Sequence, residues 1–109
     1  RQLDLEIFWT DDPFVAPTSK EMPIDGNATI TEATEQAWKL FGLGDQVKLE
    51  DVRLRKYVQF NNLPGETFTN RENRTLREVN LYSRCCLLLE KREPGTEFQN
   101  YNPNGLSVF

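Results

Sequence analysis

The chain has 109 residues, with 13 Lys and Arg, 17 Asp and Glu, no histidine and a net charge of −4 at pH 7. This length predicts a single domain. Without histidine the chain can form neither a Ser-His-Asp triad nor a Cys-His pair, and it lacks the commonest metal ligand. The negative charge argues against a nucleic-acid partner, because domains that bind nucleic acids are usually basic. The composition therefore favours protein binding over catalysis, with no cofactor and no metal site.

The ends of the chain and its two cysteines indicate its context. The chain begins at Arg1 rather than methionine and ends on an apolar, strand-like segment, so we expect it to be cut from a longer polypeptide. No stretch approaches the roughly 18 apolar residues of a membrane span, and no membrane partner is predicted. Cys85 and Cys86 are adjacent, a spacing that is poor for a disulfide. They favour a cytoplasmic or nuclear protein with reduced thiols, and no nearby base is expected to activate either one.

The amino-terminal quarter predicts two strands. In residues 3–9 every second side chain is apolar, from Leu3 to Trp9, and Asp4 and Glu6 fall on the opposite face, which is typical of a half-buried strand. Residues 10–20 contain two prolines and read as a connection without regular structure. A short strand is expected over residues 21–25, at a sheet edge because Pro23 has no N–H to donate.

One helix follows. Thr29 and Glu32 have the spacing of a capping box, in which each side chain bonds the backbone N–H of the other residue. Behind this box, apolar residues recur at helical spacing to about Phe41, and Gly42 ends the helix. Trp38 lies beside the apolar stripe, where packing at the edge of a helix–sheet interface is its expected role.

The second half of the chain predicts further strands. Residues 47–58 read as a strand with an apolar face and a basic face, where Val52 and Leu54 alternate with Arg53 and Arg55. The rest predicts, in order, a turn, a short strand, a helical turn and a last strand, over residues 61–65, 67–69, 75–81 and 85–91. One helix can bury its stripe against these strands only by lying across one face of the sheet, which makes an α+β roll.

Several segments resemble ubiquitin in their order and spacing. They are the capped helix start at Thr29, the strand around Val52–Leu54, the turn at residues 75–81 and the strand at 85–89. The resemblance covers roughly residues 3–92. It implies a ubiquitin-like β-grasp roll, with one main helix across a mixed sheet of four or five strands. On this basis residues 1–93 are expected to form the ubiquitin-like domain, and residues 94–109 a linker toward a further domain.

A closer resemblance is to the ubiquitin-like domains of large ubiquitin-specific proteases, the ubiquitin carboxyl-terminal hydrolases. Residues 52–57, 87–90 and 98–103 carry it. It implies a non-catalytic interaction or regulatory module of a deubiquitinating thiol protease, whose partners are other proteins or the parent's own catalytic domain. The cysteine, histidine and aspartate boxes of the family have no counterpart in this sequence, so no catalytic residue is assigned.

The departures from ubiquitin bear on binding. Glu93-Pro94-Gly95 stands where ubiquitin has a di-glycine tail, so conjugation to another protein is not expected. Ubiquitin's aliphatic recognition face corresponds to Arg55 and Glu90, with Leu88 as the nearby apolar residue. A charge pair would not dock into readers built for a hydrophobic surface, and we do not expect ubiquitin binding.

An alternative is a stand-alone β-grasp interaction domain that resembles Ras-binding domains. Such a domain would offer a basic strand face to an acidic partner by edge-strand addition. Here that face would consist of Arg53, Arg55 and Lys56, although a charged strand face is more often simply the solvated side. The candidate interaction surface predicted from the sequence therefore comprises Arg53, Arg55, Lys56, Leu88 and Glu90.

Overall fold

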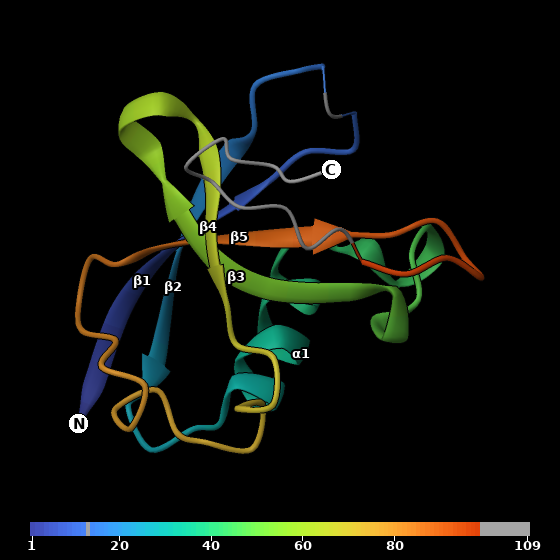
Figure 1. Ribbon diagram of the computed structural model, residues 1–109. Coiled ribbons are helices and arrows are strands. Elements are labelled where there is room, and N and C mark those ends of the chain that lie inside the picture. The colour runs from blue at the N-terminus through green and yellow to red at the C-terminus, as the bar shows by residue number, and fades with distance from the viewer. Residues whose placement is uncertain (13, 99–109) are drawn as a thin grey trace.

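The computed structural model describes residues 1–12 and 14–98, which form one five-stranded sheet with one α-helix across it (Figure 1). The predicted α+β roll is confirmed, with five strands. The main elements in chain order are β1 (Gln2–Trp9), β2 (Thr18–Asp25), α1 (Ile30–Leu40), β3 (Val52–Val58), β4 (Leu63–Thr67) and β5 (Cys86–Lys91). Three short 3₁₀ helices lie in the connections, at Leu43–Asp45, Leu49–Asp51 and Gln59–Asn61.

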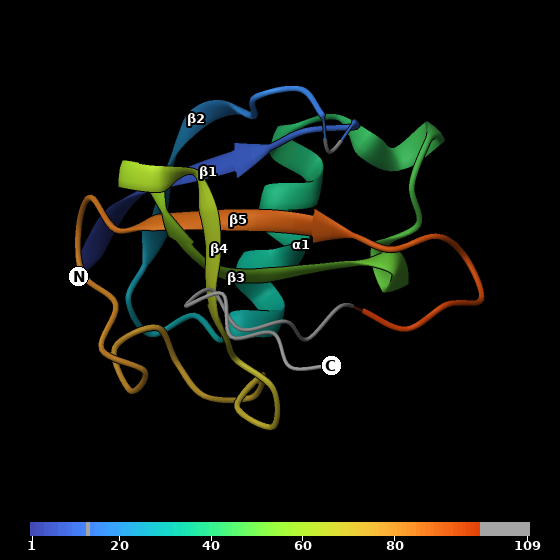
Figure 2. The ribbon, with the colours of Figure 1, turned by 45° about the horizontal axis from the view of Figure 1, so that its top comes forward.

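The sheet is mixed and has the strand order β2-β1-β5-β3-β4. β1 pairs with β5 in parallel, whereas β1–β2, β5–β3 and β3–β4 are antiparallel. Two antiparallel pairs, β1–β2 and β3–β4, therefore flank β5, which is the last of the five described strands in sequence and the central one in space. Figure 2 shows β5 between β1 and β3, with α1 crossing beneath the sheet.

The core lies between the sheet and α1. Leu5 and Ile7 of β1 and Leu87 of β5 are fully buried there, because alternate strand residues point to the same face. The helix contributes Ala33 and Ala37, which are also fully buried and whose small side chains allow a close approach to the sheet. Trp38 packs at the margin of this core and donates from Nε1 to the Val47 carbonyl oxygen at 2.7 Å, which agrees with its predicted role.

Both ends of α1 follow from its sequence. The Thr29 hydroxyl accepts from the Glu32 backbone N–H at 3.1 Å, and the Glu32 carboxylate accepts from the Thr29 N–H at 2.8 Å. This confirms the predicted capping box. Phe41 is the C-cap, and Gly42 follows with φ of 64°, a left-handed conformation that costs glycine little. With both ends fixed, α1 covers the side of the core that lies opposite the sheet.

Several predicted boundaries are wrong. The strand expected to begin near residue 47 begins at Val52, because Leu49–Asp51 forms a 3₁₀ turn first. β2 starts at Thr18 rather than residue 21, and it lies at a sheet edge as predicted. The expected turn over residues 61–65 and strand over residues 67–69 are replaced by one strand, β4 (Leu63–Thr67).

β4 contains Pro64 and Gly65, a pair that is typical of turns, so the sequence suggests a turn at this position. The strand accepts Pro64 because β4 is at the sheet edge, where one side of the ladder needs no donor. A Cβ atom at Gly65 would come within 3.0 Å of the Lys56 Cβ and 3.1 Å of the Lys56 carbonyl oxygen. Gly65 therefore allows β4 to approach β3 closely.

The predicted helical turn over residues 75–81 is a hydrogen-bonded turn and not a helix, with the Val79 N–H donating to the Thr75 carbonyl oxygen at 3.2 Å. Leu76 and Leu81 are buried within it, as expected. No helix within residues 1–12 and 14–98 is both long and apolar enough to cross a membrane. The linker predicted over residues 94–109 is described only to Phe98, and its remainder, with the strand-like segment at the end of the chain, lies outside the described residues.

Candidate interaction surface

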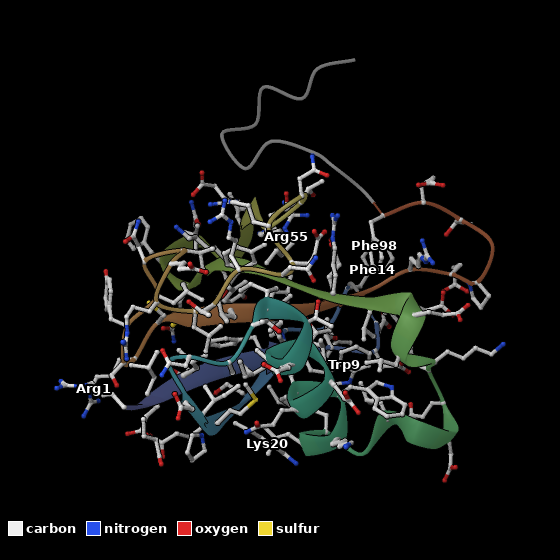
Figure 3. The ribbon with its side chains drawn as sticks, turned by 90° about the horizontal axis from the view of Figure 1, so that it is seen from below. Arg1, Trp9, Phe14, Lys20, Arg55 and Phe98 are labelled. Atoms are coloured by element: carbon white, nitrogen blue, oxygen red, sulfur yellow. The ribbon has the colours of Figure 1, made fainter. Side chains whose placement is uncertain are left out.

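Four of the five predicted surface residues meet on two neighbouring strands. The pairing of β3 with β5 sets Arg53 opposite Glu90 and Arg55 opposite Leu88. These side chains alternate with the core residues Leu54 and Leu89, so they belong to the side of the sheet away from α1. Figure 3 shows Arg55 on that side of β3.

Glu90 is the centre of an ion cluster on this side of the sheet. Its Oε1 accepts from Arg53 Nε at 2.7 Å, and its Oε2 accepts from Arg55 Nη1 at 3.2 Å. Arg55 also donates from Nε and Nη2 to the Gly65 carbonyl oxygen, at 3.0 and 2.6 Å. One carboxylate and two guanidinium groups thus connect β5, β3 and β4.

Burial changes the interpretation of Arg55. Its side chain is only 1% exposed, so it is neither the solvated charge nor the accessible basic residue that the alternation of the strand suggested. Gly65 has no side chain, and the guanidinium reaches its carbonyl oxygen inside the protein. Removing one partner of such a buried pair is costly, because the other charge loses its compensation. In this structure Arg55 and Glu90 therefore have a structural role, since they hold the strands together.

Lys56 stands apart from this cluster. Its ammonium pairs with the Glu66 carboxylate of β4 at 3.2 Å, and both side chains are exposed. Arg53, Arg55 and Lys56 consequently do not form one continuous basic face. The predicted surface divides into the ion cluster around Glu90, the separate Lys56–Glu66 pair, and the half-buried Leu88.

Phe98 packs on the domain, which the sequence pattern did not predict. Its ring lies against two guanidinium groups, with the Arg53 Cζ 4.5 Å and the Arg92 Cζ 4.9 Å from the ring centroid. Arg92 is itself held by Asp51, from Nε to Oδ1 at 3.1 Å. Such cation–π contacts are favourable, so the segment after β5 packs on the domain as far as Phe98. A single aromatic residue after a Pro-Gly pair does not belong to a periodic pattern of apolar residues, so its packing cannot be predicted from such a pattern.

The surroundings of the Cys86 thiol differ from those of a nucleophilic cysteine. Burial, and then the charge of Glu6, raise the pKa of the Cys86 thiol above its ordinary value. A nucleophilic cysteine needs the opposite shift, because the thiolate is the reactive form. Neither Cys85 nor Cys86 forms a disulfide in the described structure, and residues 1–12 and 14–98 hold no cluster of three metal-binding side chains.

The fold is shared with solved structures of low sequence identity. *Caldiarchaeum subterraneum* ubiquitin aligns over 88% of this chain and 100% of its own, with a TM-score of 0.59 and 12% identity. The carboxyl-terminal ubiquitin-like domain of mouse tubulin-specific chaperone e aligns over 89% and 93%, with a TM-score of 0.63 and 15% identity. This chain has the ubiquitin-like β-grasp fold. A structure of ATBAG1 in complex with HSP70 also contains it, over 84% of this chain and 41% of that one, with a TM-score of 0.56 and 11% identity.

The ubiquitin-like domain also has curated relatives. No family model matches the chain. Ubiquitin carboxyl-terminal hydrolase 47 of *Mus musculus* is 30% identical over 92 residues, which cover 81% of this chain, and that of *Xenopus laevis* is 32% identical over the same length. The domain spans only 7% of the length of these relatives. It therefore resembles one small part of a ubiquitin-specific protease.

Proposed function

We propose that this chain is a non-catalytic ubiquitin-like module that recruits partners to, or regulates, a deubiquitinating cysteine protease. The observation that carries the proposal is the similarity to hydrolase 47 over 92 residues, in a chain with the ubiquitin-like fold. Within the family, residues 52–57 and 87–90 resemble ubiquitin carboxyl-terminal hydrolase 40 or its relative 47, and the similarity to the mouse and frog proteins supports 47.

The partners in this proposal are other proteins or the catalytic domain of the parent enzyme. The complex of ATBAG1 with HSP70 includes a chain of the same fold, which supports a role in protein binding without naming a partner for this domain. The ion cluster argues against ubiquitin's own mode of recognition, because Arg55 and Glu90 stand where ubiquitin has aliphatic residues. The adjacent cysteines support a cytoplasmic or nuclear location.

The test uses the full-length protein. Residues 1–98 are replaced by a flexible Gly-Ser linker, and the purified enzyme is assayed for cleavage of ubiquitin chains and for recovery of bound proteins. We expect a change in the cleavage rate or the loss of at least one partner. A control in which *Caldiarchaeum* ubiquitin replaces the domain separates a specific role from simple spacing. If neither cleavage nor recovery changes, the regulatory and recruiting roles are both rejected.

The alternative, a basic strand face for an acidic partner, is not favoured by the described contacts. Arg53 and Arg55 are engaged by Glu90, and Arg55 is buried. Replacing both arginines with glutamate would place three carboxylates together in the cluster, so a loss of binding would report a loss of structure. Lys56→Glu is the cleaner test, because Lys56 is exposed. Unchanged partner recovery by this variant would reject the alternative.

A further inference from the structure

A groove of 660 Å³ lies on the side of the sheet away from α1. Tyr57, Pro64 and Leu88 contribute to its lining from β3, β4 and β5. Val15 lines it from the β1–β2 connection, and Glu97 from the segment after β5. Ligand pockets commonly have volumes of about 300–1,000 Å³, so this groove has room for a few side chains of a partner.

Exposed apolar side chains gather on the two connections beside this groove. Among the described residues, five large hydrophobic side chains are exposed, and four of them belong to the β1–β2 connection or the β3–β4 hairpin: Phe14, Val15, Val58 and Phe60. Phe14 and Phe60 are each 95% exposed. Figure 1 shows both connections rising from the sheet on the side opposite α1. Val15 itself lines the groove, and the other three residues lie on the two connections that contribute to its lining. Scattered apolar residues are ordinary on a surface, whereas neighbouring ones are typical of interaction sites.

The charges of the lining indicate what the partner carries. Lys91 Nζ lies 2.9 Å from Asp11 Oδ1, and Arg92 is paired with Asp51, so both cations of the lining are already neutralised. Glu93 and Glu97 also line the groove, and within residues 1–12 and 14–98 neither carboxylate has an ion-pair partner. The groove therefore presents apolar surface next to uncompensated negative charge.

We propose that this groove binds a peptide segment of a partner protein that carries a large apolar side chain beside Lys or Arg. The apolar side chain would pack against Val15 and Leu88, and the cation would face Glu93 and Glu97. Complementary charges at the rim of an apolar contact favour the correct partner and its orientation. The inference rests on the proposed function, since it names a binding surface and a class of partner for that interaction module.

The experiment selects binders from a displayed library of random peptides about twelve residues long, using the 109-residue chain as bait. We expect the selected peptides to combine an aromatic or aliphatic residue with an adjacent Lys or Arg. Their affinity should fall about tenfold in Val15→Ser, and again in a Glu93→Gln, Glu97→Gln double variant. The matched controls Tyr82→Ser and Glu35→Gln, at an exposed apolar and an exposed acidic position outside the groove, should stay within about twofold.

Four outcomes would overturn the inference. They are the absence of enriched peptides, enrichment of acidic peptides, equal losses in the groove and control variants, and binding that occurs only in a chain ended after Phe98. The last would assign the groove to residues 99–109 of the chain itself. Introducing Val15→Ser into the full-length protein separates this inference from the proposed function. If replacing the whole domain alters ubiquitin-chain cleavage or partner recovery while Val15→Ser alters neither, that result supports the proposed function of the module and rejects the groove as its binding site.

Discussion

On the side of the sheet that faces α1, apolar residues from β1, β2, β3 and β5 form one continuous core, whereas on the other side a single carboxylate, Glu90, engages two arginines. The first side depends on many small contributions from burial, which need only the correct alternation along each strand. The second combines the packed rings of Phe8 and Tyr57 with a few directional contacts between particular atoms. The two sides should therefore respond differently to substitution, although they belong to the same strands.

The largest effect is expected in the core. Leu87→Ala removes a fully buried side chain from β5 and should lower the free energy of unfolding by about 3 kcal/mol, through lost burial and the cavity that remains. Leu88→Ala, at the next residue on the opposite face, is the matched control and should cost about 1 kcal/mol. Urea denaturation followed by circular dichroism measures both. Equal losses would contradict the division of the sheet into two unlike sides.

A smaller loss is expected in the ion cluster. Glu90→Gln keeps the shape of the side chain but removes the charge shared by Arg53 and Arg55, and it should cost about 2 kcal/mol. Glu66→Gln, which removes an exposed partner of Lys56, should cost less than about 0.5 kcal/mol. Denaturation at low and high salt gives a second readout, because buried pairs are screened much less than exposed ones. If the loss of stability in Glu90→Gln disappears at high salt, this result contradicts the burial of the cluster.

Phe98 tests how far the second side extends beyond β5. Phe98→Ala removes a ring that contacts Arg53 and Arg92, and it should cost about 1 kcal/mol. Phe60→Ala removes an equal side chain that is almost wholly exposed, and should change the stability by less than about 0.5 kcal/mol. Thermal denaturation of the two variants measures both changes in stability. If the Phe98→Ala variant is as stable as the unchanged protein, the segment after β5 does not stabilise the domain.

The pH dependence of stability should reveal the partly buried thiol. Burial and the charge of Glu6 raise the pKa of Cys86 in the folded state. The stabilising contribution of the protonated thiol is therefore complete below the pKa of an unfolded cysteine, about 8.5, and is lost as the pH rises through the folded value. Above about pH 8.5 the unchanged protein should lose stability faster than Cys86→Ser. Parallel curves from pH 7 to 10 would contradict the shift.

The smallest effect is expected at Lys56. Lys56→Gln breaks only an exposed pair with Glu66 and should change the free energy of unfolding by less than about 0.5 kcal/mol. Urea denaturation beside Glu90→Gln makes the comparison direct. A loss as large as that of Glu90→Gln would mean that the ion cluster extends to this edge of the sheet.

The same contrast explains what could be predicted from the sequence. The alternation in residues 3–9 and the Thr29–Glu32 box are local signals, and they gave β1, the start of α1 and the fold class. The burial of Arg55 has no local signal, because it depends on the Gly65 carbonyl oxygen of another strand. β4 was predicted too late in the chain, at residues 67–69, because Pro64 and Gly65 suggest a turn unless the strand is known to lie at an edge.

The candidate surface was predictable only in part. The ubiquitin resemblance identified Arg55, Leu88 and Glu90 as neighbours on one side of the sheet, and the register confirms that they adjoin. The groove could not be predicted, because its lining comes from two connections and the segment after β5, which meet only in the folded chain. The sequence identifies each residue at the rim of the groove as polar or apolar, but it does not indicate that these residues lie together.

The position of β5 has a consequence for how the domain is made. Of the five described strands β5 is synthesised last, yet both its neighbours, β1 and β3, bond to it and not to each other. Until β5 is synthesised, β1 and β3 each lack the neighbour that they have at the centre of the sheet, and each leaves an edge open on that side. Contacts across so many residues form slowly, and unpaired edges invite association with other chains. Completion of the five-stranded sheet during translation therefore awaits β5.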